Sequence, residues 1–446
     1  MKKILSLLFT FCLLLAGCKP EQKEQPVSFK LADPADIVMY QINPRVFAPQ
    51  KSLNAATARL DSIQALGVNT IWIMPIFPIG ETKTKNSPYS ISDYKAVAPE
   101  FGTIEDYKNL VKEAHKRNMA VIQDWVPNHT SWDHPWITEH PDWYTHDAET
   151  DTIICPQGPG WDWTDVADLN YDNKDLRAAM LDAMKFWITE VGLDGFRCDV
   201  ADYVPADFWK ETIEKLREAA GDKEIVMLAE GKRPDNFTEG GFDLNYGWDY
   251  KDSLVHVFQK GYPASYLFEA DEAEYAPLPE GKYKMRFTTN HDHSTEATPC
   301  VEFTNDRGAM AAYVASIYPH GGALVYGSQE VGYPDRISFF KYVKVDWNAK
   351  PEIYKEYQKL LSLYNTYPAL RNKGKMKAFP DADIMLFEKS DGENQILVAV
   401  NVRNENKSIA VPAEWKGKVK DLYNEKDVEL GDNLDLQPFE YLILKK

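Results

Sequence analysis

Residues 225–230 read Ile-Val-Met-Leu-Ala-Glu, an unbroken apolar run that ends in a carboxylate. An apolar run without polar alternation predicts a parallel strand, because parallel strands are usually buried on both faces. Comparable runs of strand length recur at residues 37–46, 68–75, 120–126, 195–200, 242–246, 285–289 and 323–326.

Amphipathic stretches of helix length lie between these runs, at residues 103–118, 175–191, 205–220 and 350–364. The first of them has Thr103 as a candidate N-cap and Asp106 as its acidic partner three residues later. Eight strands that alternate with helices predict an α/β fold, a (β/α)8 TIM barrel. A doubly wound parallel sheet is the alternative.

The composition is that of an ordinary globular protein, with 446 residues of which 44% are hydrophobic and 26% are charged. It excludes disordered, collagen-like and coiled-coil proteins. Acidic residues outnumber basic ones by 68 to 50, for a net charge of -18. We therefore expect no binding to nucleic acid and no electrostatic attachment to anionic lipid. The 12 Trp and 24 Tyr residues fit either a large aromatic core or a sugar substrate.

The N-terminus has the features of an export signal. Two lysines at residues 2 and 3 precede an uncharged apolar stretch at residues 4–17, which is too short to span a bilayer comfortably. Residues 15–18, Leu-Ala-Gly-Cys, resemble the cleavage box of bacterial lipoproteins. We expect a signal peptide at residues 1–17, then a lipidated Cys18 and a tether at residues 18–30. The protein would be an exported lipoprotein on the periplasmic face or the cell surface, and a plain secretory peptide is the alternative.

The rest of the chain divides into a barrel, an insertion and a small final domain. We assign residues 31–130 and 175–375 to the barrel. Residues 131–174 are rich in Trp, Asp, His and Pro, and so long a connection in a compact domain is usually functional. On a barrel it would lie over the C-terminal face, where active sites form. Residues 376–446 contain short strand patterns separated by turn residues, which predict an all-β domain.

Three carboxylates lie at the C-terminal ends of predicted strands: Asp199, Glu230 and Asp292. A charge at the end of an apolar strand is costly to bury, and a barrel brings these strand ends to one face. Converging carboxylates raise one another's proton affinity, so that one stays protonated while another is ionised. Glycoside hydrolysis needs this division of labour. Alternatively, each acid caps a helix or binds a loop.

The neighbours of these acids support the first interpretation. Arg197 lies two residues before Asp199, so both side chains point the same way on a strand, and the guanidinium would hold Asp199 ionised. His129 and His291 follow strands and suit hydrogen bonding to sugar hydroxyls. Metal ligation is the alternative, although no His pair has helical ligand spacing. Tyr89, after the second strand, would stack on a sugar ring or be simply part-buried.

Several motifs resemble those of the α-amylase family of glycoside hydrolases, family 13. Four family regions occur in order on the expected strands, and further similarity extends over roughly residues 35 to 375. The four regions are residues 124–129 (Asp-Trp-Val-Pro-Asn-His), residues 195–199 (Gly-Phe-Arg-Cys-Asp), Glu230, and residues 290–292 (Asn-His-Asp). The resemblance implies a catalytic barrel, a B domain inserted after the third strand and a C-terminal antiparallel β-sandwich.

The resemblance also implies roles for individual residues. Asp199 would be the nucleophile, Glu230 the general acid and base, and Asp292 would bind ring hydroxyls at the cleavage subsite. Retention of the α-configuration would follow, with the nucleophile and the acid roughly 5 Å apart. The other residues expected to bind or orient substrate are Tyr89, Asp124, His129, Arg197 and His291.

The implied function is a retaining hydrolase of α-glucosidic bonds in maltooligosaccharides or starch-derived glucans. The alternatives are a catalytically inactive α-glucan-binding protein on the same barrel and a transglycosylase of the same family. Residues 199–203, Asp-Val-Ala-Asp-Tyr, lack the Lys-His of many endo-acting amylases and are closer to neopullulanase relatives. No cofactor is expected for the chemistry. The resemblance also allows a structural calcium ion at Asn128, but no other residue of the sequence supports one.

Overall fold

The computed structural model describes residues 29–158 and 160–446. The predicted signal peptide, Cys18 and nearly all of the predicted tether lie outside these residues. Within the described ranges, no helix has both the length and the apolar character needed to cross a membrane.

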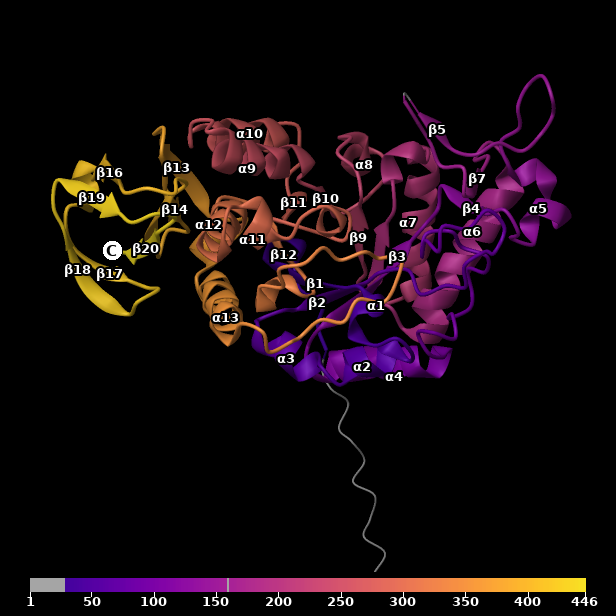
Figure 1. The fold of residues 1–446 in the computed structure, drawn as a ribbon. Helices are drawn as coiled ribbons and strands as arrows, with labels where there is room; N and C mark the ends of the chain where they lie inside the picture. The colour runs from indigo at the N-terminus through magenta and orange to yellow at the C-terminus, as the bar shows by residue number, and fades with distance from the viewer. Residues whose placement is uncertain (1–28, 159) are drawn as a thin grey trace, which may run out of the picture.

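The central domain is a closed parallel barrel, as predicted (Figure 1). Each of the eight apolar runs contains one barrel strand or overlaps it. The strands are β1 (Val38–Ile42), β2 (Thr70–Ile73), β3 (Ala120–Trp125), β8 (Gly195–Cys198), β9 (Val226–Ala229), β10 (Leu244–Tyr246), β11 (Tyr283–Arg286) and β12 (Gly322–Tyr326).

The barrel closes where β12 pairs with β1, with Val38 opposite Ala323. Every other barrel strand pairs in parallel with its neighbours in chain order, in the sequence β1-β12-β11-β10-β9-β8-β3-β2. The doubly wound alternative is therefore wrong. Because all eight strands are parallel, the loops that follow them gather at one rim of the barrel.

Side chains on alternate strand positions fill the inside of the barrel. In β9, Val226 and Leu228 point inward, whereas Met227 and Ala229 pack against the surrounding helices. Both faces of the strand are thus buried, which explains the unbroken apolar run at 225–229. The inner cluster is Ile37, Met39, Trp72, Ile122, Val226, Leu228, Leu244, Tyr246, Met285, Phe287 and Leu324.

The helices surround the barrel and begin where the sequence provides caps. At α4, Thr103 Oγ1 accepts from the Asp106 backbone N–H, and the Asp106 carboxylate accepts from the Thr103 N–H, which confirms the predicted cap. The helices are α1 (Pro44–Phe47), α2 (Ser52–Thr57), α3 (Leu60–Ala65), α4 (Ile104–Lys116), α6 (Lys174–Phe186), α7 (Ala206–Ala220), α8 (Asp235–Thr238), α9 (Trp248–Lys260), α10 (Tyr266–Tyr275), α11 (Pro299–Glu302), α12 (Asp306–Ile317) and α13 (Pro351–Thr366). After α6, residues Trp187–Val191 form a π-helical turn, so the stretch predicted as one helix changes its winding.

The chain leaves the barrel between β3 and α6 and forms a small subdomain, purple at the right of Figure 1. Its first strand pairs with its last, with His129 opposite Asp168. This pairing brings the end of the excursion back over the barrel rim. The elements are β4 (His129–Ser131), α5 (Trp136–Glu139), β5 (Gln157–Gly158), β6 (Trp161–Asp162) and β7 (Val166–Asp168).

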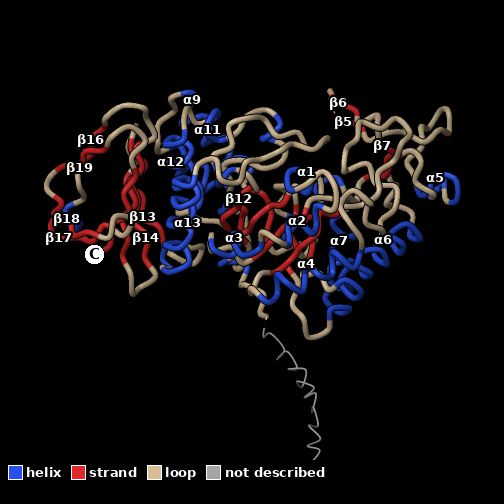
Figure 2. Tube along the Cα trace, turned by 60° about the horizontal axis from the view of Figure 1, so that its bottom comes forward, coloured by secondary structure: helices blue, strands red, loops and turns tan. Residues whose placement is uncertain are grey.

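Two antiparallel sheets form the C-terminal domain, at the left of Figures 1 and 2. Trp415, Leu386 and Leu436 lie in one cluster of buried side chains between the sheets. The larger sheet has the order β13 (Lys375–Phe379), β14 (Ile384–Ser390), β15 (Gln395–Asn401), β20 (Tyr441–Lys445), β17 (Gly417–Asp421) and β18 (Lys426–Leu430). The smaller sheet pairs β16 (Lys407–Ala410) with β19 (Asn433–Leu436).

Candidate active site

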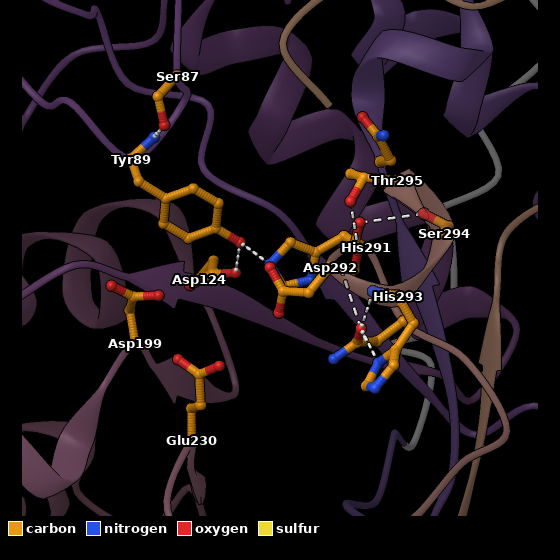
Figure 3. Close-up of polar contacts among 12 residues, drawn as sticks. Ser87, Tyr89, Asp124, Asp199, Glu230, His291, Asp292, His293, Ser294 and Thr295 are labelled. Atoms are coloured by element: carbon orange, nitrogen blue, oxygen red, sulfur yellow. Dashed lines mark hydrogen bonds and ion pairs between the residues drawn. The ribbon is translucent and has the colours of Figure 1, made fainter. Parts of the chain in front are cut away.

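Three carboxylates border one cavity at the rim of the barrel. Asp199 directly follows β8, Glu230 directly follows β9, and Asp292 lies in the loop after β11. Figure 3 shows their side chains directed toward a common space below Tyr89. The cavity has a volume of about 360 Å³ and is lined by Lys85, Ser87, Tyr89, His129, Trp163, Asp165, Val166, Asp199, Val200, Glu230, His291, Asp292, Phe339 and Phe340.

The pairing of β8 with β9 sets Asp199 beside Glu230. Cys198 lies opposite Ala229, and the hydrogen bonding continues past the strand ends, because the Glu230 N–H donates to the Cys198 carbonyl at 2.9 Å. The Asp199 N–H donates to the carbonyl of Trp125 in β3 at 2.8 Å. Both carboxylates are therefore held on rigid backbone, which limits their reorganisation during a reaction.

The guanidinium of Arg197 contacts three carboxylates. Its Nη1 lies 2.8 Å from Asp124 Oδ1 and 2.9 Å from Asp199 Oδ1, and its Nη2 lies 2.9 Å from Glu230 Oε2. Its Nε donates to Tyr246 Oη at 3.1 Å. Arg197 is fully buried, so these contacts are little screened by solvent. One cation thus orients both neighbouring acids at the rim.

The acids around Arg197 carry more negative charge than it can neutralise. Burial raises the pKa of Asp199 well above its usual value, the nearby Glu230 charge raises it further, and Arg197 opposes both effects. Burial also raises the pKa of Asp124, to about 7, against the same guanidinium. Neighbouring buried carboxylates resist ionising together, so this group of acids keeps a proton more readily than a free carboxyl group does. Such an arrangement can supply an acid and a nucleophile at once.

Tyr89 and His291 form a hydrogen-bonded chain behind the carboxylates. Gln41 Nε2 donates to His291 Nδ1 at 2.8 Å, which leaves the proton of the ring on Nε2. His291 Nε2 then donates to Tyr89 Oη at 2.7 Å, and Tyr89 donates to Asp124 Oδ2 at 3.1 Å. Burial lowers the pKa of His291 to about 3, so the ring stays neutral. The chain fixes the face that Tyr89 and His291 present to the cavity (Figure 3).

Two further predicted residues line the cavity. His129 begins β4, and its ring lies edge-on to Trp163 with the centroids 5.5 Å apart. Burial lowers the pKa of His129 to about 4, so it too is neutral. The Asp292 N–H donates to Asn290 Oδ1 at 3.0 Å, and His291 Nε2 lies 3.3 Å from Asp292 Oδ1. These contacts direct the half-exposed Asp292 carboxylate into the cavity.

Asp124 and Arg197, which we expected among the substrate-binding residues, lie behind the cavity wall. Both side chains are fully buried and neither lines the cavity. Arg197 contacts Asp199 and Glu230 at the rim, and Asp124 contacts Arg197 from behind. The other six predicted site residues in the described chain line the cavity together: Tyr89, His129, Asp199, Glu230, His291 and Asp292.

Eight residues that line the cavity were not among the predicted site residues, and four of them matter below. Lys85 lies on the loop after β2, Asp165 lies just before β7, and Phe339 and Phe340 lie on the loop after β12. Two adjacent phenylalanines in a loop that follows a barrel strand are a usable signal, because such loops form the active-site face. Lys85 and Asp165 carry no comparable signal.

Within the part of the chain that the structure describes, no group of three or more His, Cys, Asp or Glu side chains is placed to hold a metal ion. Asn128, where a calcium ion was one option, has its Nδ2 3.4 Å from His129 Nδ1, and its carbonyl accepts from the Leu169 N–H. Calcium takes about six to eight oxygen ligands. The contacts that the structure gives for Asn128 do not assemble such a set.

The alpha-amylase catalytic-domain family model matches residues 26–408. The alpha-amylase MalA of Haloarcula japonica is 28% identical over 405 residues, which are 86% of this chain and 58% of that protein. The oligo-1,6-glucosidase of Bacillus cereus is 32% identical over 213 residues, 41% of this chain and 38% of that protein. The chain thus spans little more than half the length of the first of these curated relatives.

Solved structures resemble most of the chain. The maltogenic alpha-amylase AmyB of Thermotoga neapolitana has a TM-score of 0.83 and 26% identity, and the match covers 93% of this chain and 99% of that one. An alpha-amylase of Lactobacillus plantarum has a TM-score of 0.81 with the same identity and the same coverage. The barrel, the insertion and the C-terminal sheets therefore occur together in other proteins.

Proposed function

The chain belongs to the alpha-amylase family of glycoside hydrolases, and from this membership we propose that it hydrolyses α-glucosidic bonds of maltooligosaccharides or starch-derived glucans with retention of configuration. One observation carries the proposal. Asp199 and Glu230 end adjacent strands, share the Arg197 guanidinium and open on the same cavity. A pure binding protein has no need of such an acid pair.

The reaction proceeds in two displacements. Asp199 attacks the anomeric carbon, the bond from this carbon to the glycosidic oxygen breaks, and Glu230 gives its proton to the departing oxygen. A covalent glycosyl ester on Asp199 results. Glu230 then takes a proton from water, the hydroxide attacks the anomeric carbon, and the ester bond to Asp199 breaks. One water is consumed, and both carboxyl groups return to their starting states.

The surrounding groups hold the sugar and the acids in place. Arg197 keeps Asp199 oriented and favours its ionised form when Glu230 carries the proton. Asp292 and neutral His129 accept from or donate to ring hydroxyls of the sugar bound at the cleavage point. Neutral His291 uses both ring nitrogens within the protein and holds Tyr89 beside that sugar. The Tyr89 ring offers a face for stacking against that sugar.

Incubation of the purified protein with maltoheptaose tests the proposal. We expect shorter oligosaccharides on chromatography, and we expect Asp199→Asn and Glu230→Gln to lose more than about 1000-fold of the rate. Asp182→Asn, at an exposed position of α6, is the matched control. An inactive α-glucan-binding protein would bind maltoheptaose without products, and a transglycosylase would give products longer than the substrate.

We also propose that the protein is exported and anchored to a membrane by lipid on Cys18. The motif at residues 15–18 supports this proposal. Metabolic labelling with a fatty-acid analogue should mark the wild type and leave Cys18→Ser unlabelled and released from membranes. Labelling of both proteins would contradict the lipid anchor on Cys18.

The proposed chemistry needs no cofactor, and activity should survive dialysis against EDTA.

A further inference from the structure

Three chain segments meet along one side of the cavity. The loop after β2 supplies Lys85, the loop after β12 supplies Phe339 and Phe340, and the segment before β7 supplies Asp165. Phe339 packs edge-on against Tyr89 with the centroids 5.8 Å apart, and Ser90 Oγ donates to the Asp165 carbonyl at 3.4 Å, so both segments adjoin the loop that carries Tyr89. We call this set of residues, with Asn86, the wall.

Direct contacts join the three segments of the wall. Lys85 Nζ lies 3.0 Å from Asp165 Oδ1, which connects the loop after β2 with the insertion. Asn86 Nδ2 donates to the Phe340 carbonyl and connects the same loop with the loop after β12. Both partners of the ion pair border the cavity. The wall is therefore continuous from the insertion to the loop after β12.

Arg45 fastens the wall from behind. Its Nη1 donates to the Asn86 carbonyl at 2.7 Å and to the Phe339 carbonyl at 3.0 Å, and its Nη2 lies 2.7 Å from Glu100 Oε1. The Arg45 carbonyl accepts from the Val343 N–H at 3.0 Å. Because Arg45 is buried, these bonds resist exchange with water. The two loops are thus held together as a fixed part of the cavity.

Aromatic packing fills the space behind the contacts. Phe339 and Phe340 stack with their ring centroids 4.4 Å apart, and Phe339 also packs edge-on against His291 at 5.5 Å. The cavity volume of about 360 Å³ is at the low end of the range of about 300–1000 Å³ for ligand sites. The wall therefore bounds one side of a small cavity.

The chemistry gives the pocket a direction. Glu230 must protonate the departing oxygen, so the departing part of the substrate lies beside Glu230 and beyond it. In the proposed mechanism, the sugar that Asp199 attacks would lie against Tyr89, His291 and Asp292, which line the cavity together with Asp199. Further sugars on its non-reducing side would have to pass the wall. A chain that runs through the site would collide with the Phe339–Phe340 pair or with the Lys85–Asp165 bridge.

We propose that the wall makes the enzyme exo-acting, so that it binds the non-reducing end of an α-glucan and releases a short product from that end. This inference rests on the proposed function. Lys85, Asn86 and Phe340 determine the specificity, because they exclude substrates that continue past the pocket. The catalytic acids themselves would act equally well in an open groove.

Paired substrates test the proposal. One is p-nitrophenyl α-maltoheptaoside, and the other is the same compound with its non-reducing end blocked by a 4,6-O-ethylidene group. We expect the wild type to degrade the blocked compound at least about 100-fold more slowly, because the block collides with the wall. Equal degradation of both compounds overturns the proposal. Degradation of neither contradicts the proposed function itself, so the two failures are distinguishable.

Variants of the wall add a second readout. Lys85→Ala removes the bridge to Asp165, and Asn86→Gly removes the bond to Phe340. Glycine at residue 86 keeps the left-handed backbone, because φ is 62° there. In the variant that combines Lys85→Ala with Asn86→Gly, the ratio of the rate on the unblocked compound to the rate on the blocked compound should fall by at least about tenfold. Lys95→Ala, in the exposed ion pair with Asp182, is the control that should leave the ratio unchanged. A folded double variant with an unchanged ratio overturns the role of these two residues, and the wild-type comparison decides the exo proposal even if the variant does not fold.

Discussion

The guanidinium of Arg197 lies 2.9 Å from Glu230 Oε2 through its Nη2, while its Nη1 lies 2.9 Å from Asp199 Oδ1. A planar guanidinium can reach several carboxylates because its nitrogens diverge in a rigid fork. The relative position of the proposed acid and nucleophile therefore depends on one buried side chain. The strand pairing of β8 with β9 fixes the backbones, and Arg197 fixes the functional groups.

Replacement of Arg197 by lysine should separate charge from geometry. Lysine keeps the positive charge but offers one compact ammonium group, which cannot contact Asp124, Asp199 and Glu230 together. We expect kcat/KM on maltoheptaose to fall at least about 100-fold. Arg177→Lys is the control, because Arg177 pairs with the exposed Asp207 at the surface. Near wild-type activity of the Arg197 variant would contradict the bridging role.

Removal of the Arg197 charge should also lower the free energy of unfolding. Arg197→Met leaves three acids without their cation, and loss of one partner of a buried ion pair costs about 3–5 kcal/mol. Urea unfolding followed by circular dichroism measures the loss. Proton uptake by Asp124 and Asp199 relieves part of the repulsion. The destabilisation should therefore be smaller at pH 5 than at pH 8, and equal losses at the two pH values would argue against a charge effect.

The hydroxyl of Tyr89 should matter separately from its ring. Tyr89→Phe keeps the stacking face but leaves the His291 N–H with only the longer contact to Asp292 Oδ1, and it removes one donor from Asp124 Oδ2. An unsatisfied buried polar group costs about 1–3 kcal/mol, so we expect kcat/KM to fall by about tenfold or more. Tyr342→Phe, at an exposed position, is the control. If Tyr89→Phe is fully active, the series of hydrogen bonds from Gln41 through His291 and Tyr89 to Asp124 has no role in catalysis.

Buried neutral histidines should make the protein less stable in mild acid. Burial lowers the pKa of His134 to about 4, whereas an unfolded histidine has a pKa of about 6.5. As the pH falls from about 6.5 to 4, the unfolded chain takes up a proton that the native state refuses, so the free energy of unfolding decreases by about 1.4 kcal/mol per pH unit for each such group. The measured change in the free energy of unfolding is the sum over several groups. Asp199, whose pKa is raised in the native state, contributes stability as the pH falls and so opposes the effect of the histidines.

A variant isolates the contribution of His134. His134→Asn keeps an acceptor for the Trp136 N–H but cannot titrate. The difference in unfolding free energy between wild type and variant should change by about 3 kcal/mol from pH 6.5 to 4. His146, whose carbonyl partners Pro141 and Asp151 raise its pKa, serves as the control. For His146→Asn, the difference in unfolding free energy between wild type and variant should change with pH in the opposite direction. The same pH dependence for both variants would contradict the lowered pKa of His134.

The barrel was predictable because its signals are local. Each strand is an apolar run in the sequence, and the unbroken run at 225–229 reflects burial of both faces of β9. The catalytic acids were recognisable for the same reason, since Asp199 and Glu230 directly follow such runs. Thr103 and Asp106 similarly marked the start of α4.

The ion pair of the wall between Lys85 and Asp165 was not predictable, because the two residues meet only in the folded chain. Lys85 and Asp165 are ordinary charged loop residues, and only the return of the insertion over the rim brings them within 3.0 Å. Burial of Asp124 was equally hidden. It depends on Arg197, Tyr89 and Trp72, which come from other strands and loops.

Gly195 should tolerate no side chain, because β8 and β9 approach too closely there. A Cβ at this residue would lie 1.8 Å from the Val226 carbonyl oxygen, and φ is 142°, a conformation that side chains disfavour. Gly192 has φ of 86° with nothing within 4 Å of a Cβ, so Gly192→Ala pays only the backbone strain of about 1–2 kcal/mol. Gly195→Ala must also push β9 away from β8, which separates Glu230 from Asp199. We expect a loss above about 4 kcal/mol in urea unfolding, or no soluble folded protein. Equal losses for the two alanine variants would show that the close approach of β8 to β9 does not limit this position.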